Sequence, residues 1–256
     1  MRPREPGAYQ NERLHDRNRK MLLFSQSCRT FLRIAILAVI LLCSGIASIM
    51  AMEDPLLMAN PEEFALFEKQ GRWGYKDGQG RVVIDAKFHA AQDFLRGGIA
   101  AVVDEQGWAY IDQRGCVLIR PFIFDNGPDY FQEGLARFTV DRKFGFFDDH
   151  GQVVISPRFD FAFPFHEGLA AACMGCRIQR QGEHPVVKGG DWGYVNHKGA
   201  WAIPPEFQFA GPFANGEAQV TRQGKCAYID QKGTIFKTCS AKENRNLLNH
   251  DSRKKP

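Results

Sequence analysis

A six-residue stretch, Arg72-Trp73-Gly74-Tyr75-Lys76-Asp77, recurs four more times along the chain with small changes. The later copies are Gly107-Trp108-Ala109-Tyr110-Ile111-Asp112, Lys143-Phe144-Gly145-Phe146-Phe147-Asp148, Asp191-Trp192-Gly193-Tyr194-Val195-Asn196 and Lys225-Cys226-Ala227-Tyr228-Ile229-Asp230. Their lead positions, 73, 108, 144, 192 and 226, are separated by 35, 36, 48 and 34 residues. A steady period of this length indicates an array of repeated structural units, and the spacing of 48 indicates an insertion in one of them.

Each copy alternates an aromatic residue, a small residue and another aromatic residue. In a β-strand, this alternation places the two large side chains on one face. The glycine or alanine between them allows a neighbouring group to approach the strand closely. Because repetition at a fixed phase is what stacking requires, we expect these aromatic residues to form the core: Trp73, Tyr75, Trp108, Tyr110, Phe144, Phe146, Trp192, Tyr194 and Tyr228.

A turn follows each copy, with Asp or Asn four residues after the lead position and Gly three residues later. We interpret it as a four-residue hairpin turn in which the Asp side chain caps backbone amides and the Gly takes a positive φ. Calcium binding is a poor alternative because one carboxylate per repeat cannot converge on an ion. The pairs are Asp77 with Gly80, Asp112 with Gly115, Asp148 with Gly151, Asn196 with Gly199, and Asp230 with Gly233.

Two further strands complete each repeat. A second strand such as Val153-Val154-Ile155 follows the turn, and we expect Pro121, Pro157 and Pro205 to end the ladder of hydrogen bonds. A third short strand opens at runs such as Gly168-Leu169-Ala170. Three short strands cannot bury their own apolar face, so neighbouring repeats must stack.

The expected fold is therefore all-β, with tandem repeats of short antiparallel strands in an open curved array. The alternative is a closed five-bladed propeller whose last blade is completed by residues 64–68, since that segment resembles a third strand without its first two. The repeat domain spans 53–236. Its parts lie near 62–70 (partial), 71–106, 107–142, 143–190 with the insertion 173–190, 191–224 and 225–236 (partial).

The N-terminal region indicates export. Residues 1–33 are basic, and residues 1–20 of them are polar; we expect this segment to be disordered except where it forms the charged start of a signal. Residues 34–52 are apolar and end in small residues, which predicts a signal peptide; they are also just long enough for an uncleaved membrane anchor. Translation from Met21 instead of Met1 would give a signal of ordinary length. Either way the body is expected to be periplasmic or extracellular.

Charge is unevenly distributed along the 256 residues. Of the 33 basic and 29 acidic groups, residues 1–33 carry eight and three, and the tail 237–256 carries six and two. The segment between them therefore holds 19 basic and 24 acidic groups. The folded body is mildly acidic, which argues against nucleic acid as a partner. We expect contact with a membrane only through residues 34–52, and the basic tail is expected to be flexible.

The insertion contains Cys173-Met174-Gly175-Cys176, which has several interpretations. A local disulfide fits an exported protein best. A metal site, with His184 as a further ligand, and a thiol-redox pair remain alternatives. The body has five cysteines, an odd number, so we expect one to be unpaired or to form an intermolecular bond. Cys226, in a core slot, is expected to be a buried thiol.

Catalytic constellations are missing from the sequence. Only Ser156, Ser240 and Ser252 follow the signal, and Ser156 lies in a repeat position beside proline. Gly224-Lys225 lacks the rest of a phosphate loop. We therefore predict no catalytic residues and no cofactor, and expect a protein that is not an enzyme.

The body resembles the WG-repeat family, also called KWG repeats. The resemblance rests on Trp73-Gly74-Tyr75, Trp192-Gly193-Tyr194, the Asp-x-x-Gly turns, and Glu-Gly-Leu-Ala at 133–136 and 167–170. It covers roughly residues 62–236, with departures at Phe144, Cys226, Ala109 and Ala227. It implies a β-rich interaction surface without established catalysis. We therefore predict an exported binding scaffold for a protein or peptide, or an envelope glycan; the alternative is a metal-binding or thiol-redox protein that uses Cys173 and Cys176.

Overall fold

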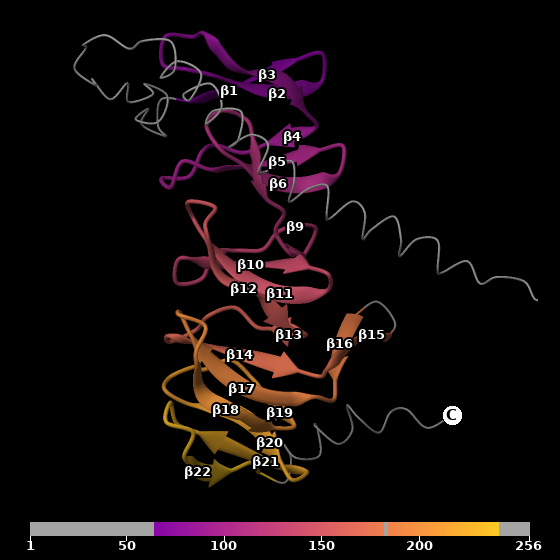
Figure 1. Ribbon diagram of the computed structural model, residues 1–256, viewed down its shortest axis with the longest axis vertical. Helices are drawn as coiled ribbons and strands as arrows, with labels where there is room; N and C mark the ends of the chain where they lie inside the picture. Colours follow the sequence, from indigo (N-terminus) through magenta and orange to yellow (C-terminus); the bar gives the residue numbers. More distant parts are fainter. Residues whose placement is uncertain (1–63, 182–183, 241–256) are drawn as a thin grey trace, which may run out of the picture. The chain divides into compact units, whose positions relative to one another are not determined.

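A computed structural model of the chain describes residues 64–181 and 184–240 (Figure 1). Within these ranges the chain is all-β, as the repeated strand pattern predicted. No helix in them is long and apolar enough to cross a membrane. The predicted signal or anchor at 34–52, the segment 1–33 and most of the basic tail lie outside the described residues.

The chain divides into two compact halves, Met1–Pro128 and Asp129–Pro256. The described part of the first half holds a three-stranded sheet (β1–β3), a four-stranded sheet (β4–β7) and a small hairpin (β8 and β9). Their bounds are β1 Ala65–Lys69, β2 Arg72–Lys76, β3 Val82–Phe88, β4 Ala90–Ala91, β5 Ala100–Asp104, β6 Gly107–Ile111, β7 Val117–Ile119, β8 Ile123–Phe124 and β9 Gly127–Pro128.

The second half holds three sheets of the repeat and one extra hairpin. The sheets are β10–β12, then β13, β14, β17 and β18, and finally β19–β22; the hairpin is β15 and β16. The bounds are β10 Leu135–Val140, β11 Lys143–Asp148, β12 Val153–Phe159, β13 Phe161–Ala162, β14 Leu169–Met174, β15 Arg177–Gln181, β16 His184–Lys188, β17 Asp191–Asn196, β18 Trp201–Phe207, β19 Phe209–Ala210, β20 Ala218–Arg222, β21 Lys225–Ile229 and β22 Ile235–Thr238.

Each sheet combines parts of two sequence repeats. The third strand of one repeat pairs with the lead strand of the next, as β14 does with β17. In the same way β1 pairs with β2, placing Leu66 opposite Tyr75. The last sheet is built from β19 to β22. Residues 64–68 therefore do not complete the last sheet, and the strand pairing that the propeller alternative required is not formed among the described residues.

The glycine of the repeated motif faces a bulge in the second strand. Trp192 lies opposite Phe207 and Tyr194 opposite Ile203, so β18 carries two more residues than β17 over this interval. A Cβ on Gly193 would lie 2.6 Å from the Ile203 carbonyl oxygen and 2.8 Å from the Pro205 nitrogen. Only glycine therefore allows the bulge to press this closely against β17.

The prediction that proline ends the ladder is wrong for two of three positions. Strands β12 and β18 run through Pro157 and Pro205 and pair again beyond them, at Phe159 and Phe207. The proline lies in the bulge, where its missing N–H costs no ladder hydrogen bond. Where alanine replaces the glycine the bulge is missing: β7 ends at Ile119, and Ala227 pairs directly with Thr238.

Most of the predicted core residues are buried. Tyr75, Tyr110, Phe144, Phe146, Trp192 and Tyr194 are inaccessible or nearly so, whereas Trp73, Trp108 and Tyr228 are half-buried. The buried hydroxyls have backbone partners: Tyr75 donates to the Gln92 carbonyl and Tyr194 to the Gly211 carbonyl, each 17 residues later. Burial raises the pKa of both tyrosines far above the ordinary value.

Successive sheets touch through the turn glycines. A Cβ built on Gly199 would lie 3.0 Å from the side chain of Ile155 in the preceding sheet, and one on Gly233 would lie 3.1 Å from Ile203. Gly115 has the same relationship to Ile84 in the first half. The turn of each of these sheets thus rests on the last strand of the sheet before it, which is how neighbouring repeats share a core.

Candidate functional site

The candidate site is the insertion in the third sequence repeat. At the equivalent connection, Asp141-Arg142 and Gln223-Gly224 form tight turns with positive φ at both residues. Between Met174 and Asp191, which pair with each other, the chain instead leaves the sheet and forms β15 and β16. In Figure 1 this hairpin projects beside the ends of β14 and β17. It belongs to none of the repeated sheets.

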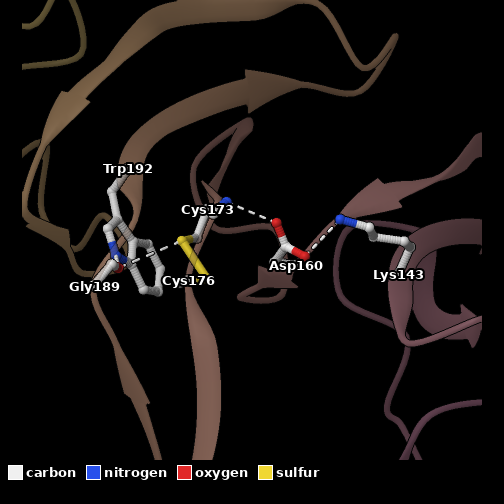
Figure 2. The surroundings of a disulfide bond; sticks show 7 residues. Lys143, Asp160, Cys173, Cys176, Gly189 and Trp192 are labelled. Atoms are coloured by element: carbon white, nitrogen blue, oxygen red, sulfur yellow. Dashed lines mark hydrogen bonds and ion pairs between the residues drawn. A yellow bond between two sulfur atoms is a disulfide. The ribbon is translucent and has the colours of Figure 1, made fainter.

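A disulfide holds the base of the hairpin. Cys173 at the end of β14 is bonded to Cys176 just before β15, with the two Cα atoms 6.1 Å apart (Figure 2). The returning chain packs against this bridge at Gly190, where a Cβ would lie 2.7 Å from Cys173 Sγ and 2.4 Å from the Cys176 nitrogen. Both cysteines are buried. The bridge and the bare glycine backbone therefore pack together where the hairpin leaves the sheet.

Asp160 anchors the same base. Its carboxylate accepts a hydrogen bond from the Gly175 amide at 2.7 Å and pairs with the Lys143 ammonium group at 2.5 Å (Figure 2). Its own amide donates to the Cys173 carbonyl. Burial raises the pKa of Asp160, but the hydrogen bonds from Lys143 and Gly175 outweigh that effect and hold it below the ordinary value. The carboxylate stays ionised at neutral pH and fixes the Cys-x-x-Cys turn.

Trp192 lies beneath the base. The indole N–H donates to the Gly189 carbonyl, and the ring packs among Phe161, Phe163 and Phe209. It is only 1% exposed. The lead residue of the repeat motif thus connects the hairpin to the hydrophobic core of its sheet.

The two strands of the hairpin differ in exposure: the described side chains of β16, at 186–188, are half-buried, and those of β15, at 177–179, are exposed. Val187 is partly buried against the core cluster that contains Trp192. Its cross-strand partner Ile178 is 48% exposed, and the neighbouring Arg177 and Gln179 are exposed. The solvent-exposed strand of the hairpin is therefore β15.

Other predicted site residues lie apart from the hairpin. The side-chain oxygens of the turn residues accept hydrogen bonds from the amides two and four residues later, as Asp77 does from Gln79 and Arg81. Asp112, Asp148, Asn196 and Asp230 repeat this pattern. The turn glycines at 80, 115, 151, 199 and 233 have positive φ.

No metal centre emerges from the described parts of the chain, 64–181 and 184–240. They contain no group of three or more His, Cys, Asp or Glu residues arranged to hold an ion. Cys173 and Cys176 use their sulfur atoms for the disulfide. The side chain of His184 lies outside the part that the structure describes.

Three features of the site and its frame were missed by sequence reasoning. Cys226, expected as a buried thiol, is bonded to Cys239 across the last sheet. The role of Asp160 could not be predicted from the sequence, because a single acidic residue after an aromatic residue forms no recognisable motif. Glu133 and Glu167 bind the Gly168 and Gly216 amides of the following repeats; their recurrence within Glu-Gly-Leu-Ala was the available signal.

Comparison with known families agrees with this architecture. The model of the WG containing repeat matches three times, at residues 73–108, 144–175 and 192–226. The chain belongs to the WG-repeat family. These matches include the lead positions 73, 144 and 192 with the turns that follow them, and the second one ends within the Cys-x-x-Cys turn. A WG-repeat domain of stacked β-units suggests a binding or scaffold module.

Other comparisons add little. The curated proteins include no match. Among solved structures, this WG-repeat chain is similar to a eukaryotic initiation factor (12% identity, 69% of this chain and 52% of that one, TM-score 0.33). It is also similar to a protein of unknown function from Bacteroides caccae (15%, 73% and 81%, 0.24) and to apo AztD from Citrobacter koseri (13%, 70% and 58%, 0.25). The chain spans about half the length of the first of these. At such TM-scores the similarities carry no argument.

Proposed function

We propose that this protein is an exported, non-enzymatic scaffold whose β15–β16 hairpin binds a protein or peptide partner. The observation that carries the proposal is the attachment of the hairpin. Its base is held by the Cys173–Cys176 disulfide, by Asp160 and by Trp192, although its strands contribute to no repeated sheet. A long insertion with this much local support is suited to recognition, because a rigid frame presents it in one conformation.

Export is supported by the chemistry of the cysteines. Within 64–181 and 184–240, the disulfides Cys173–Cys176 and Cys226–Cys239 stabilise different sheets. Disulfides persist in oxidising compartments and are rare in the cytosol. Together with the signal-like segment 34–52, they favour a periplasmic or extracellular location.

Site-specific photo-crosslinking tests the proposal. A photoreactive amino acid replaces Ile178 in the full chain, and a matched control replaces Val153 on β12, whose exposure is similar at 52% against 48%. Ultraviolet irradiation of cells producing each variant should yield a discrete adduct with a second protein at position 178 but not at 153. Adducts of equal yield at both positions, or none at 178, contradict the proposal.

A further inference from the structure

The two strands of the hairpin differ in the backbone N–H and C=O groups that they expose on their outer edges. They pair only with each other in the sheet order of the described residues. Two residues connect Gln181 to His184, which makes that pair a hydrogen-bonded one. Hydrogen-bonded and non-bonded pairs alternate along an antiparallel ladder. Ile178 and Arg180 on β15 therefore direct their N–H and C=O groups outward. On β16, Val187 directs both groups outward and Pro185 directs only its C=O.

Proline blocks one edge and leaves the other intact. Pro185 has no N–H, so β16 lacks a donor in the middle of its outer edge. Strand β15 has both donors, at Ile178 and Arg180, and no proline. Proline on an exposed edge is a known protection against unwanted strand pairing. Here it protects β16 alone.

The surroundings of β15 favour one kind of partner. Segment 177–181 carries two arginines and no acidic residue, although the chain from 34 to 236 as a whole has an excess of acidic groups. Ile178 is 48% exposed, and its neighbour Arg177 is exposed as well. A strand that alternates acidic and β-branched side chains matches this edge in charge, in hydrogen bonding and in its apolar contact.

We infer that β15 accepts an extended acidic segment of a partner protein as a third, antiparallel strand of the hairpin sheet. The inference rests on the proposed function, because it takes the hairpin as the element that contacts the partner. Recognition then combines main-chain hydrogen bonds at Ile178 and Arg180 with an ion pair to Arg177, whose exposed side chain alternates with that of Ile178 along the strand. The partner strand lies outside β15, and Pro185 prevents the equivalent addition at β16.

Amide hydrogen exchange of the full chain tests this inference. The probe is a pool of six-residue peptides, acetylated and amidated, in which Asp or Glu alternates with Val, Ile or Thr. The pool should slow exchange of the Ile178 and Arg180 amides by about tenfold or more. The Gln179 amide, which already bonds to β16, should change little. A pool with Lys in place of the acids and the acidic pool N-methylated at alternate residues are the controls, and neither should give protection.

Variants provide an independent measurement. Ile178→Pro removes an outward donor without touching the bonds between β15 and β16, whereas Ile178→Thr keeps the donor and changes only the side chain. Peptide affinity should fall more than tenfold in Ile178→Pro and by less than about threefold in Ile178→Thr, because the backbone donor carries more of the binding than the side chain. Equal affinities in the two variants overturn strand addition. So does a pool that leaves both amides unprotected.

The two proposals fail in distinguishable ways. If the photoreactive residue at 178 captures a partner while the acidic pool leaves the Ile178 and Arg180 amides exchanging freely, strand addition is wrong and the hairpin binds in another manner. If position 178 captures nothing, the proposed function fails, and the inference that depends on it fails with it.

Discussion

The carboxylate of Glu133 accepts a hydrogen bond from the amide of Gly168, 35 residues and one repeat later. Glu167 does the same for Gly216 across 49 residues, a distance lengthened by the insertion. Glu133 also contacts His197 at 3.1 Å. These carboxylates bind backbone donors of the following repeat at the start of its third strand, and so they couple neighbouring repeats.

Removal of this coupling should cost stability. Glu133→Ala should lower the free energy of unfolding by about 1 kcal/mol, since a partly exposed, charge-assisted hydrogen bond is lost. Glu133→Gln keeps an acceptor and should lose less. Urea unfolding of the three proteins gives the comparison. If Ala and Gln are indistinguishable from wild type, the bond does not contribute.

The motif glycines should tolerate no side chain. Gly193→Ala places a Cβ 2.6 Å from the Ile203 carbonyl oxygen, and we expect a loss of at least about 2 kcal/mol as the bulge in β18 is forced away. Ala227→Gly is the matched control in a sheet without that bulge, and it should cost less than about 1 kcal/mol. Thermal unfolding of the two variants and of wild type measures both losses of stability. A well-tolerated Gly193→Ala would show that the bulge can relax.

The two disulfides should differ in their effect on stability. Cys226–Cys239 closes a separation of 13 residues and Cys173–Cys176 one of 3. In the chain-entropy view, the longer loop contributes roughly 3 kcal/mol and the shorter about half of that. The double variants Cys226→Ala with Cys239→Ala, and Cys173→Ala with Cys176→Ala, measure this in urea.

Peptide mapping without reduction checks the same bonds. Both linked peptides should be recovered from protein isolated from its natural compartment. Free thiols at Cys173 and Cys176 in that sample would contradict the disulfide and weaken the case for export.

Acid should loosen the base of the hairpin through Asp160. The pKa of this carboxyl is lowered in the folded protein, so its contribution to stability is complete above its unfolded value of about 4 and is lost as the pH falls through the folded value. Unfolding measured from neutral pH down to about pH 2 should therefore show a smaller acid loss in Asp160→Asn than in wild type. Parallel pH profiles would show that Asp160 does not contribute.

The sequence period allowed the repeated strands, turns and core residues to be predicted. Features that depend on which residues face each other across two strands could not be predicted in this way. Turns and core residues follow from the spacing of Asp, Gly and aromatic residues, because local chemistry determines them. The continuation of β12 past Pro157 did not follow, since it depends on a bulge facing Gly145. The bond between Cys226 and Cys239 was missed for a related reason. Cys226 and Cys239 occupy the positions that Trp192 and Phe207 have in the preceding sheet. Because the last sheet lacks the bulge opposite the motif alanine, these two positions are 13 residues apart in the sequence instead of 15.

Lys237 occupies a position at which other sheets of the array have isoleucine. The residue opposite the second aromatic position of the motif is Ile84, Ile119, Ile155 or Ile203 in four sheets. In the last sheet Tyr228 faces Lys237, whose ammonium group lies 4.4 Å from the ring centre. In the two preceding sheets, the turn glycine of the following sheet packs on this isoleucine, Ile155 or Ile203. In the last sheet the same position holds Lys237, which is exposed.

A charge at this position should oppose further stacking on the last sheet, as polar outer faces do at the ends of repeat arrays. Lys237→Ile should restore the surface on which another repeat packs, and it should raise the weight-average mass in sedimentation at concentrations where wild type is unchanged. Lys237→Arg keeps the charge and should sediment like wild type. If Lys237→Ile also matches wild type at every concentration, the lysine is not what keeps this face free of a further copy.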